Sequence, residues 1–339
     1  MFDLRNRRVF LKRTEISGIS LGDLYIGATV TVYSRQLVIK EYADLYTRTA
    51  FEEKRGKTCA LIKPDAYLHM GKIINRIQSE GFSINNIKMI KFTPETAAEF
   101  YRDHVGKPFY PNLVDFMCSD VTIAMELVRE NAIEHWRSVI GPTNSLQAKD
   151  DAPSSIRGQF GTDVTKNACH GSDSRPNAQR EIDIVFNSGT FAKPTALLNN
   201  CSCVIIKPHA VKNGQAGQII DRVLEEGFEV SALQLFNLDL PTAEEYFEVY
   251  KGVLPEFLPM VEHMTTGPCF ALEVRQENVV PAVRKLCGPH DPEIAKHLRP
   301  DSLRAKFGGD RVENAVHCTD LPEDGVLDCE YFFSIMQGK

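Results

Sequence analysis

The feature that most constrains this chain of 339 residues is a long internal repeat. Residues 61–66 recur as residues 205–210, and their lysines, Lys63 and Lys207, are 144 positions apart (207 − 63 = 144). His170 and His317, each three residues after an asparagine, are 147 positions apart (317 − 170 = 147). Several features therefore recur in one order at nearly one offset. Because the period is too long for a solenoid unit, the sequence predicts two tandem domains.

The composition excludes several classes of protein. Hydrophobic residues make up 43% of the chain and charged residues 25%, as in ordinary globular domains. The net charge of −6 argues against a nucleic-acid partner, whose phosphates would be repelled. We expect no membrane partner, because no apolar run approaches the length of a membrane span and no secretory leader opens the chain. The nine cysteines show neither an even framework nor a Cys-x-x-Cys pair, which predicts reduced thiols and a cytoplasmic location.

Within each repeat, strand and helix patterns alternate. In the first repeat we expect a helix after Thr93, its predicted N-cap, where Pro94 opens the first turn. The other expected elements are strands at 58–62, 82–92 and 121–127 and helices at 71–79 and 132–139. This order predicts an α+β fold, with two tandem ferredoxin-like α/β sandwich domains built on antiparallel sheets.

The remaining segments lie outside the repeat. Residues 1–50 contain two alternating stretches, 8–13 and 29–33, which predict a short β-rich N-terminal segment. The charged residues 51–57 are expected to form a linker. A second linker is expected at 187–200, where glycine, proline, asparagine and threonine gather.

The polar setting of His170 points to chemistry. The residue stands between Asn167 and a glycine, serine and aspartate, which bury little apolar surface. Neighbours on a strand face opposite sides, so a thiol–imidazole pair with Cys169 is not expected. Neutral imidazole attacks phosphorus well, and lysine and arginine stabilise a moving phosphoryl group. The residues alone leave other interpretations open: Lys63 as a solvated lysine, Arg137 as a helix-face charge, and Phe109 and Leu113 as core residues.

Five blocks of the first repeat narrow these alternatives. Together they resemble nucleoside diphosphate kinase, and the similarity covers residues 58–186, whereas residues 201–336 resemble a second, divergent domain of that family. The arrangement resembles the tandem-domain type 7 of these kinases. The segment 1–50 resembles the end of a DM10 domain, a module of ciliary axoneme proteins. The blocks are residues 63–65, 107–110, 141–144, 155–158 and 167–174.

The resemblance implies catalytic roles for five residues of the first domain. His170 would take the γ-phosphate of a nucleoside triphosphate and pass it to a nucleoside diphosphate. Glu181 would hold the other imidazole nitrogen, and Ser172 would lie beside that pair. Lys63 would contact phosphate, and Tyr101 would orient it.

It also implies a nucleotide site. Phosphate would be bound by Lys63, Arg137, Thr143 and Arg157, and ribose by Lys63 and Asn167. Phe109 would stack on the base beside Leu113 and Val164. Stacking accepts every base. The implied cofactor is Mg²⁺, held by nucleotide phosphates without a direct protein ligand, with Asp173 as a second-sphere candidate.

The second domain keeps part of this set: Lys207, Arg284, Arg304, Asn314 and His317. It departs where Cys318 and Thr319 follow the histidine, where His290 replaces the threonine, and where Asp328 stands at the glutamate position. A shorter orienting group weakens catalysis. We therefore expect weak or no transfer at His317.

The resemblance implies a kinase that binds nucleoside triphosphates and diphosphates and associates with the cytoskeleton, in the ciliary axoneme or at the centrosome, through tubulin or other proteins there. An alternative from another class stays open: a mainly structural microtubule-associated component with vestigial catalysis. The two linked domains would also be able to pair as a pseudo-dimer within one chain.

Overall fold

The structure is a computed structural model. It describes residues 1–14, 16, 19, 24, 26, 28–33, 35–44, 46–47, 56–191 and 193–338.

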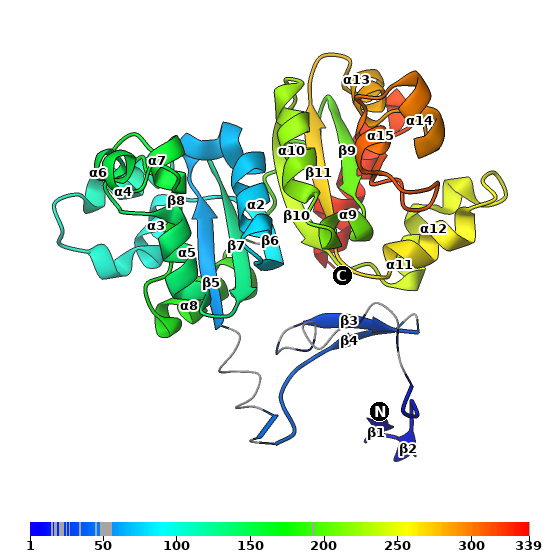
Figure 1. The fold of residues 1–339 in the computed structure, drawn as a ribbon, viewed down its shortest axis with the longest axis horizontal. Coiled ribbons are helices and arrows are strands. Elements are labelled where there is room, and N and C mark those ends of the chain that lie inside the picture. The colour runs from blue at the N-terminus through cyan, green and yellow to red at the C-terminus, as the bar shows by residue number, and fades with distance from the viewer. Residues whose placement is uncertain are drawn as a thin grey trace.

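The first domain is a four-stranded antiparallel sheet covered by helices (Figure 1). Its strand order, β6-β7-β5-β8, is the ferredoxin-like order expected from the alternation of strands and helices. The sheet and its two main helices are β5 (Gly56–Ile62), α2 (Met70–Ser79), β6 (Ser83–Lys91), β7 (Val121–Arg129), α5 (Ala132–Ile140) and β8 (Cys169–Gly171). Shorter helices connect them: η2 (Pro64–His69), α3 (Pro94–Phe100), η3 (Arg102–His104), α4 (Tyr110–Met117), α6 (Ser145–Asp151) and α7 (Ile156–Phe160). After β8 come α8 (Arg175–Ile182) and η4 (Asp183–Asn187).

The second domain repeats this plan, with the strand order β10-β11-β9-β12. Its main elements are β9 (Cys201–Ile206), α10 (Ala216–Glu225), β10 (Glu229–Phe236), β11 (Cys269–Arg275), α13 (Val279–Cys287) and β12 (Val316–Cys318). The connecting helices are α9 (Pro208–Lys212), α11 (Leu240–Tyr246), η5 (Glu248–Tyr250), α12 (Phe257–Met264), α14 (Pro292–Leu298) and α15 (Leu303–Phe307). The chain ends in η6 (Pro322–Asp324), α16 (Gly325–Glu330), η7 (Tyr331–Ile335) and η8 (Met336–Gly338).

The two sheets join edge to edge. β6 and β10 are antiparallel neighbours, with Lys88 opposite Gln234, so one eight-stranded sheet runs through both domains. Beside this junction α2 and α10 lie against each other (Figure 1). The pairing of two domains within one chain is therefore present, as expected.

Glycines allow the close approach of α2 and α10. A Cβ atom added at Gly71 would lie 2.3 Å from the backbone nitrogen of Asp221, and one at Gly217 would lie 2.1 Å from that of Asn75. A side chain of any size would push the helices apart. Gly71 and Gly217 thus lie on the two helix faces that meet in the interface between the domains.

The predicted elements of the first repeat are confirmed. Helix α2 buries Ile73, Ile74 and Ile77, the residues whose helical spacing predicted it. Thr93 caps α3, because its side chain accepts a hydrogen bond from the backbone nitrogen of Thr96. Gly81 ends α2 with φ 78°, a left-handed conformation that suits glycine.

The N-terminal segment forms two small hairpins, β1 (Phe2–Asp3) with β2 (Arg8–Val9) and β3 (Thr29–Val32) with β4 (Arg35–Val38). The strand expected at 8–13 is reduced to the two residues of β2. The second hairpin lies against the second domain: the Thr31 hydroxyl donates to the Thr265 carbonyl at 2.6 Å.

The first expected linker needs correction at its end. Residues 51–55 lie outside the described residues, but Gly56 and Lys57 belong to β5, where the Lys57 ammonium lies 3.5 Å from the Glu126 carboxylate. The linker at 187–200 is held by both domains. Lys88 donates to the Phe191 carbonyl at 2.6 Å, and the Glu273 carboxylate accepts the Leu197 and Leu198 backbone nitrogens at 2.7 Å.

Within the described ranges, 56–191 and 193–338 included, no helix is both long and apolar enough to cross a membrane.

Candidate active site

His170 lies on β8, the edge strand of the first sheet, opposite Leu61 of β5. Its side chain is 16% exposed, whereas its strand neighbour Cys169 is fully buried. Burial raises the pKa of the Cys169 thiol to about 12. The cysteine is therefore a neutral core residue, as the alternation of strand neighbours predicted, and the histidine faces the site.

The turn before β8 is held in place by the lysine motif, which is the repeated segment 61–66 that contains Lys63. Ala168 has φ 64°, a strained conformation for a residue with a side chain. Its carbonyl accepts the Lys63 backbone nitrogen at 2.8 Å, and its own nitrogen donates to the Asp65 carboxylate at 2.9 Å. The position of His170 thus depends on the loop that follows β5.

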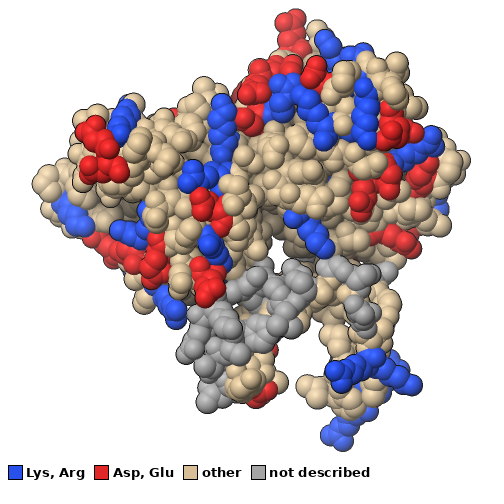
Figure 2. Space-filling view, in the orientation of Figure 1, with Lys and Arg blue, Asp and Glu red and all other residues tan. Residues whose placement is uncertain are grey.

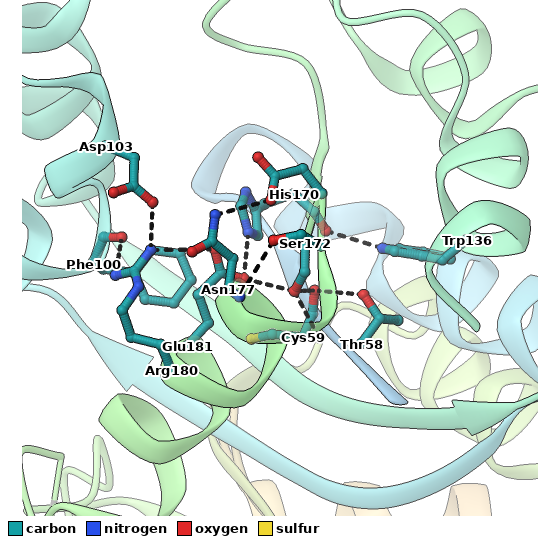
Figure 3. Close-up of polar contacts among 12 residues, drawn as sticks. Thr58, Cys59, Phe100, Asp103, Trp136, His170, Ser172, Asn177, Arg180 and Glu181 are labelled. Atoms are coloured by element: carbon teal, nitrogen blue, oxygen red, sulfur yellow. Dashed lines mark hydrogen bonds and ion pairs between the residues drawn. The ribbon is translucent and has the colours of Figure 1, made fainter. Parts of the chain in front are cut away.

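The imidazole is held by a carboxylate (Figure 3). Nε2 of His170 lies 3.0 Å from Oε2 of Glu181, and the Ser172 hydroxyl donates to that same oxygen at 2.7 Å. The rings of Phe100 and Tyr101 pack edge to face with the imidazole, with ring centroids 5.2 and 5.6 Å from its own. The contact with Glu181 places a proton on Nε2 and leaves the lone pair on Nδ1.

Arg180 braces the carboxylate from behind. Its guanidinium lies 3.9 Å from Glu181, pairs with Asp103 at 3.0 Å and donates to the Phe100 carbonyl at 3.1 Å (Figure 3). It therefore ties α8, which carries Glu181, to the ends of α3 and η3. Sequence reasoning missed this residue, although it adjoins Glu181.

Two buried cations flank the strand that carries the histidine. Lys63 donates to the Asn167 side chain at 2.8 Å, and Arg157 donates to the Cys169 carbonyl at 3.0 Å. Burial, with the charge of Arg157, lowers the pKa of Lys63 to about 8. Burial lowers the pKa of Arg157 to about 10, so both groups are charged at neutral pH. Asn167 in turn donates to the Thr143 carbonyl at 2.9 Å.

The other expected nucleotide contacts lie further out. Arg137 of α5, Phe109 at the start of α4, and Val164 are exposed, whereas Leu113 is buried in the core that α4 covers. The ammonium of Lys107 lies 5.8 Å from the centre of the Phe109 ring.

Tyr101 differs from its expected role. Its ring packs on His170, but its buried hydroxyl has no hydrogen-bond partner among the described residues, and Lys63 is held by Asn167 instead. Burial, with the charge of Glu181, raises the pKa of the Tyr101 hydroxyl.

The donor set suits a metal that arrives on phosphate. In the part of the chain that the structure describes, one cluster has metal-ligand composition, and it lies in the second domain: Cys201, Glu273 and Cys329. Both oxygens of Glu273 are already occupied as hydrogen-bond acceptors. Near His170 there is the exposed Asp173, which accepts from Asn177 at 2.9 Å. One carboxylate fits a second-sphere contact to phosphate-bound Mg²⁺.

The second domain keeps the framework of this site. Arg304 donates to the Gly288 and Val316 carbonyls at 2.6 and 3.2 Å, as Arg157 does to the matching residues. Asn314 donates to the His290 carbonyl at 3.0 Å, as Asn167 does to Thr143.

The second histidine has lost its support. His317 is 9% exposed, and no described residue forms a hydrogen bond with its ring. Burial lowers its pKa to about 3, and burial raises that of Asp328 to about 6. Asp328 is one methylene shorter than Glu181, and among the interactions of the described residues it forms neither a hydrogen bond nor an ion pair with the imidazole; it accepts a hydrogen bond from Thr319 instead. Phe247 packs at 5.0 Å where the first domain has Tyr101.

Lys207 also differs from its counterpart. Its ammonium donates to the Val312 carbonyl at 2.9 Å, but the Oδ1 atom of Asn314 has no partner among the described residues. Burial and the charge of Arg304 lower the pKa of Lys207 to about 7. At neutral pH this lysine is charged only part of the time.

Two further positioning residues escaped sequence reasoning. The indole nitrogen of Trp136 donates to the His170 carbonyl at 3.0 Å, and Asp65 anchors the preceding turn. Asp65 had a signal, since it belongs to the repeated lysine motif. Trp136, the single tryptophan, had none, because a tryptophan on an amphipathic helix predicts only burial.

The chain is similar to known proteins over its whole length. The sequence model of a family described as "Nucleoside diphosphate kinase" matches residues 56–191 and 200–337. The rat protein "Nucleoside diphosphate kinase homolog 7" (Rattus norvegicus) is 48% identical over 338 residues, which cover 99% of this chain and 86% of that protein. The "Nucleoside diphosphate kinase" of Aquifex aeolicus is 49% identical over 133 residues, 39% of this chain and 94% of that protein. A crystal form of the Aquifex aeolicus kinase superposes with a TM-score of 0.39 at 48% identity, over 39% of this chain and 96% of the other. This chain belongs to the nucleoside diphosphate kinase family.

Proposed function

We propose that the first domain is an active nucleoside diphosphate kinase that works through a phosphohistidine at His170. The observation that carries this proposal is the imidazole whose Nε2 is fixed by Glu181, 3.0 Å away, while Nδ1 stays available. Lys63 and Arg157 stand beside it as cations. A fixed tautomer, an available lone pair and nearby cations are what phosphoryl transfer requires.

The reaction has two balanced halves. In the first, Nδ1 of His170 attacks the γ-phosphorus of a nucleoside triphosphate, an N–P bond forms, the bond to the bridging oxygen breaks, and a nucleoside diphosphate leaves. In the second, the terminal oxygen of another nucleoside diphosphate attacks the phosphohistidine and frees the imidazole. Glu181 keeps the proton on Nε2 and stabilises positive charge on the ring.

The remaining residues bind the nucleotide. Lys63, Arg137, Thr143 and Arg157 would bind phosphate, and Asn167 with Lys63 would bind ribose. The exposed ring of Phe109 would stack on the base, with Val164 and Leu113 beside it. When bound, Mg²⁺ spreads the charge that develops on the phosphate oxygens, with Asp173 in its second sphere.

We further propose that His317 transfers little or no phosphate. Among the described residues no carboxylate forms a hydrogen bond with its ring, so nothing fixes the tautomer or stabilises the positive charge that transfer places on the ring. The chain would thus combine one active domain with a second domain that keeps the kinase fold but has little or no transfer activity.

We also propose an association with the cytoskeleton, in the ciliary axoneme or at the centrosome. The alternative, a mainly structural microtubule-associated component, draws on the same observation. Exposed basic side chains gather on the first hairpin, away from the sheet (Figure 2). A partner with an acidic surface, with tubulin as our candidate, would be attracted there. The residues are Arg5, Arg7, Arg8, Lys12 and Arg13.

Labelling tests the kinase. Wild-type chain incubated with γ-labelled ATP and Mg²⁺ is expected to gain an acid-labile, base-stable label that unlabelled nucleoside diphosphate removes. His170→Ala should abolish this label, and the matched His317→Ala should leave it in place. An unlabelled wild type that still binds nucleotide would favour the structural alternative.

Co-sedimentation tests the location. Wild type should pellet with microtubules at low salt, and a variant with Arg5, Arg7 and Arg8 changed to glutamine should stay in solution. Equal pelleting of both chains would remove the basic hairpin as the docking surface.

A further inference from the structure

The cavity around His317 holds a negative charge of the chain's own. It has a volume of about 580 Å³, and its lining includes Tyr250, Arg284, Arg304, His317 and Asp320. One oxygen of Asp320 pairs with the Arg284 guanidinium, and the other accepts the Tyr250 hydroxyl. Arg284 is the counterpart of Arg137, which the kinase proposal assigns to phosphate.

The first domain arranges the same residues differently. Asp173, the counterpart of Asp320, accepts a hydrogen bond from the Asn177 amide at 2.9 Å. Among the described residues Arg137 forms no ion pair, so its guanidinium stays available to a ligand, and it is exposed.

Two replacements explain the difference. Asp324 stands where the first domain has Asn177 (177 + 147 = 324), and a carboxylate cannot donate to Asp320 and repels it. Tyr250 ends η5 where His104 ends η3, and its hydroxyl donates to the displaced carboxylate. The repulsion and the new donor both direct Asp320 toward Arg284.

We propose that Asp320 acts as an internal anion that occupies the phosphate-binding face of the second cavity and keeps nucleotide phosphate out. The carboxylate engages the cation that phosphate would use, and its charge repels an incoming phosphate. The hydrogen bond from Tyr250 opposes the effect of burial on Asp320 and favours the ionised form, with its pKa lowered.

We call this contact between Asp320 and Arg284 the latch. The side chains of Arg284 and Asp320 are 48% and 43% exposed, so solvent reaches the pair and screens it. Removing the carboxylate should therefore open the cavity without disturbing the core. The inference rests on the proposed function only in assigning Arg284 to phosphate, and a binding experiment separates the two.

Titration calorimetry with Mg·ADP on the full chain tests the latch. Wild type is expected to bind one equivalent, in the first domain. Asp320→Asn should bind a second equivalent, with the affinity of the second cavity raised about tenfold or more, as expected when like charge is removed from a binding face. Tyr250→Phe should give an intermediate gain, and Glu323→Gln, which removes a neighbouring exposed charge, should behave as wild type.

The outcomes are distinct. Two equal sites in wild type, or one site in wild type and still only one in a folded Asp320→Asn and in Tyr250→Phe, would overturn the latch while the kinase proposal stands. No site in wild type and one in Asp320→Asn would support the latch and sink the kinase proposal. Far-UV circular dichroism establishes that each variant is folded, and Tyr250→Phe decides the matter if Asp320→Asn is not.

Discussion

The two domains share one backbone plan and differ in the few side chains that surround a histidine. Both place the histidine on the edge strand, both lock the preceding turn with an alanine in a left-handed conformation, and both hold that turn from the lysine loop. Among the described residues of the second domain, no carboxylate forms a hydrogen bond with the imidazole, and Arg284 is paired with Asp320. The fold thus tolerates replacement of the groups around the histidine, because the core packing does not depend on them.

The replacements in the second domain form a consistent set. Leu327 stands where Arg180 braces Glu181 in the first domain (180 + 147 = 327), and Asp328 is too short to reach the ring. With no carboxylate to hold, the bracing arginine has no role.

The largest expected effect comes from giving the first domain the second domain's acid. Glu181→Asp withdraws the carboxylate from Nε2 and should lower kcat/KM about a hundredfold, since a small misplacement of an orienting group has that effect. Steady-state kinetics with ATP and a nucleoside diphosphate measures it. Asp328→Glu alone should not create transfer at His317, because Leu327 and Asp320 remain. Unchanged kinetics for Glu181→Asp would show that the fixed imidazole is not required.

The next largest effect concerns the packing of α2 against α10, the interface that the two domains share. Gly217→Ala forces a Cβ atom to within 2.1 Å of the Asn75 backbone and should lower the free energy of unfolding by about 2 kcal/mol, a typical cost of overpacking. Urea denaturation measures the loss. Gly309→Ala, whose added Cβ would lie 3.8 Å from its nearest neighbour, serves as control. Equal stability of both variants would mean that α2 and α10 are not closely packed.

A smaller effect follows from the two lysines. Lys63 is protonated below its pKa of about 8, so its attraction for phosphate is present at neutral pH and is lost as the pH rises. ADP affinity of the first domain should fall about tenfold between pH 7 and pH 9.5, the worth of one charge-assisted hydrogen bond. Calorimetry at several pH values measures the fall, and Lys63→Arg should flatten it.

The second lysine gives the matched comparison. Because the pKa of Lys207 is about 7, the second site opened by Asp320→Asn should lose affinity about one pH unit earlier. Parallel curves for the two sites would contradict the difference between their lysines.

The smallest effect concerns Arg180, whose guanidinium supports the Glu181 carboxylate. Arg180→Leu copies the second domain and should lower kcat about fivefold with KM unchanged, because the guanidinium pairs with Glu181 and Asp103, neither of which is assigned to the nucleotide. Arg180→Lys should keep most of the activity, since a cation would still reach Asp103. A rise in KM with normal kcat would instead assign Arg180 to nucleotide binding.

Much of this comparison is local in sequence and could be predicted. The period of α2, the cap at Thr93 and the polar setting of His170 each depend on neighbours within a few positions, and the offset between the repeats is visible in the sequence itself. The failures lie where distant segments decide. Gly56 and Lys57 look like linker but pair with β7.

The sequence by itself determined that two copies of one α+β domain follow each other and that His170, with Glu181, is the better equipped histidine. Only the tertiary structure decided how the copies join into one sheet and which charges meet inside each site. Asp173 and Asp320 hold the same place in the repeat, yet one accepts from Asn177 and the other pairs with Arg284. The reason is that a carboxylate takes the nearest donors in space. Asn177 lies only four positions from Asp173, whereas Arg284 and Tyr250 lie 36 and 70 positions from Asp320 and are brought to it by the fold.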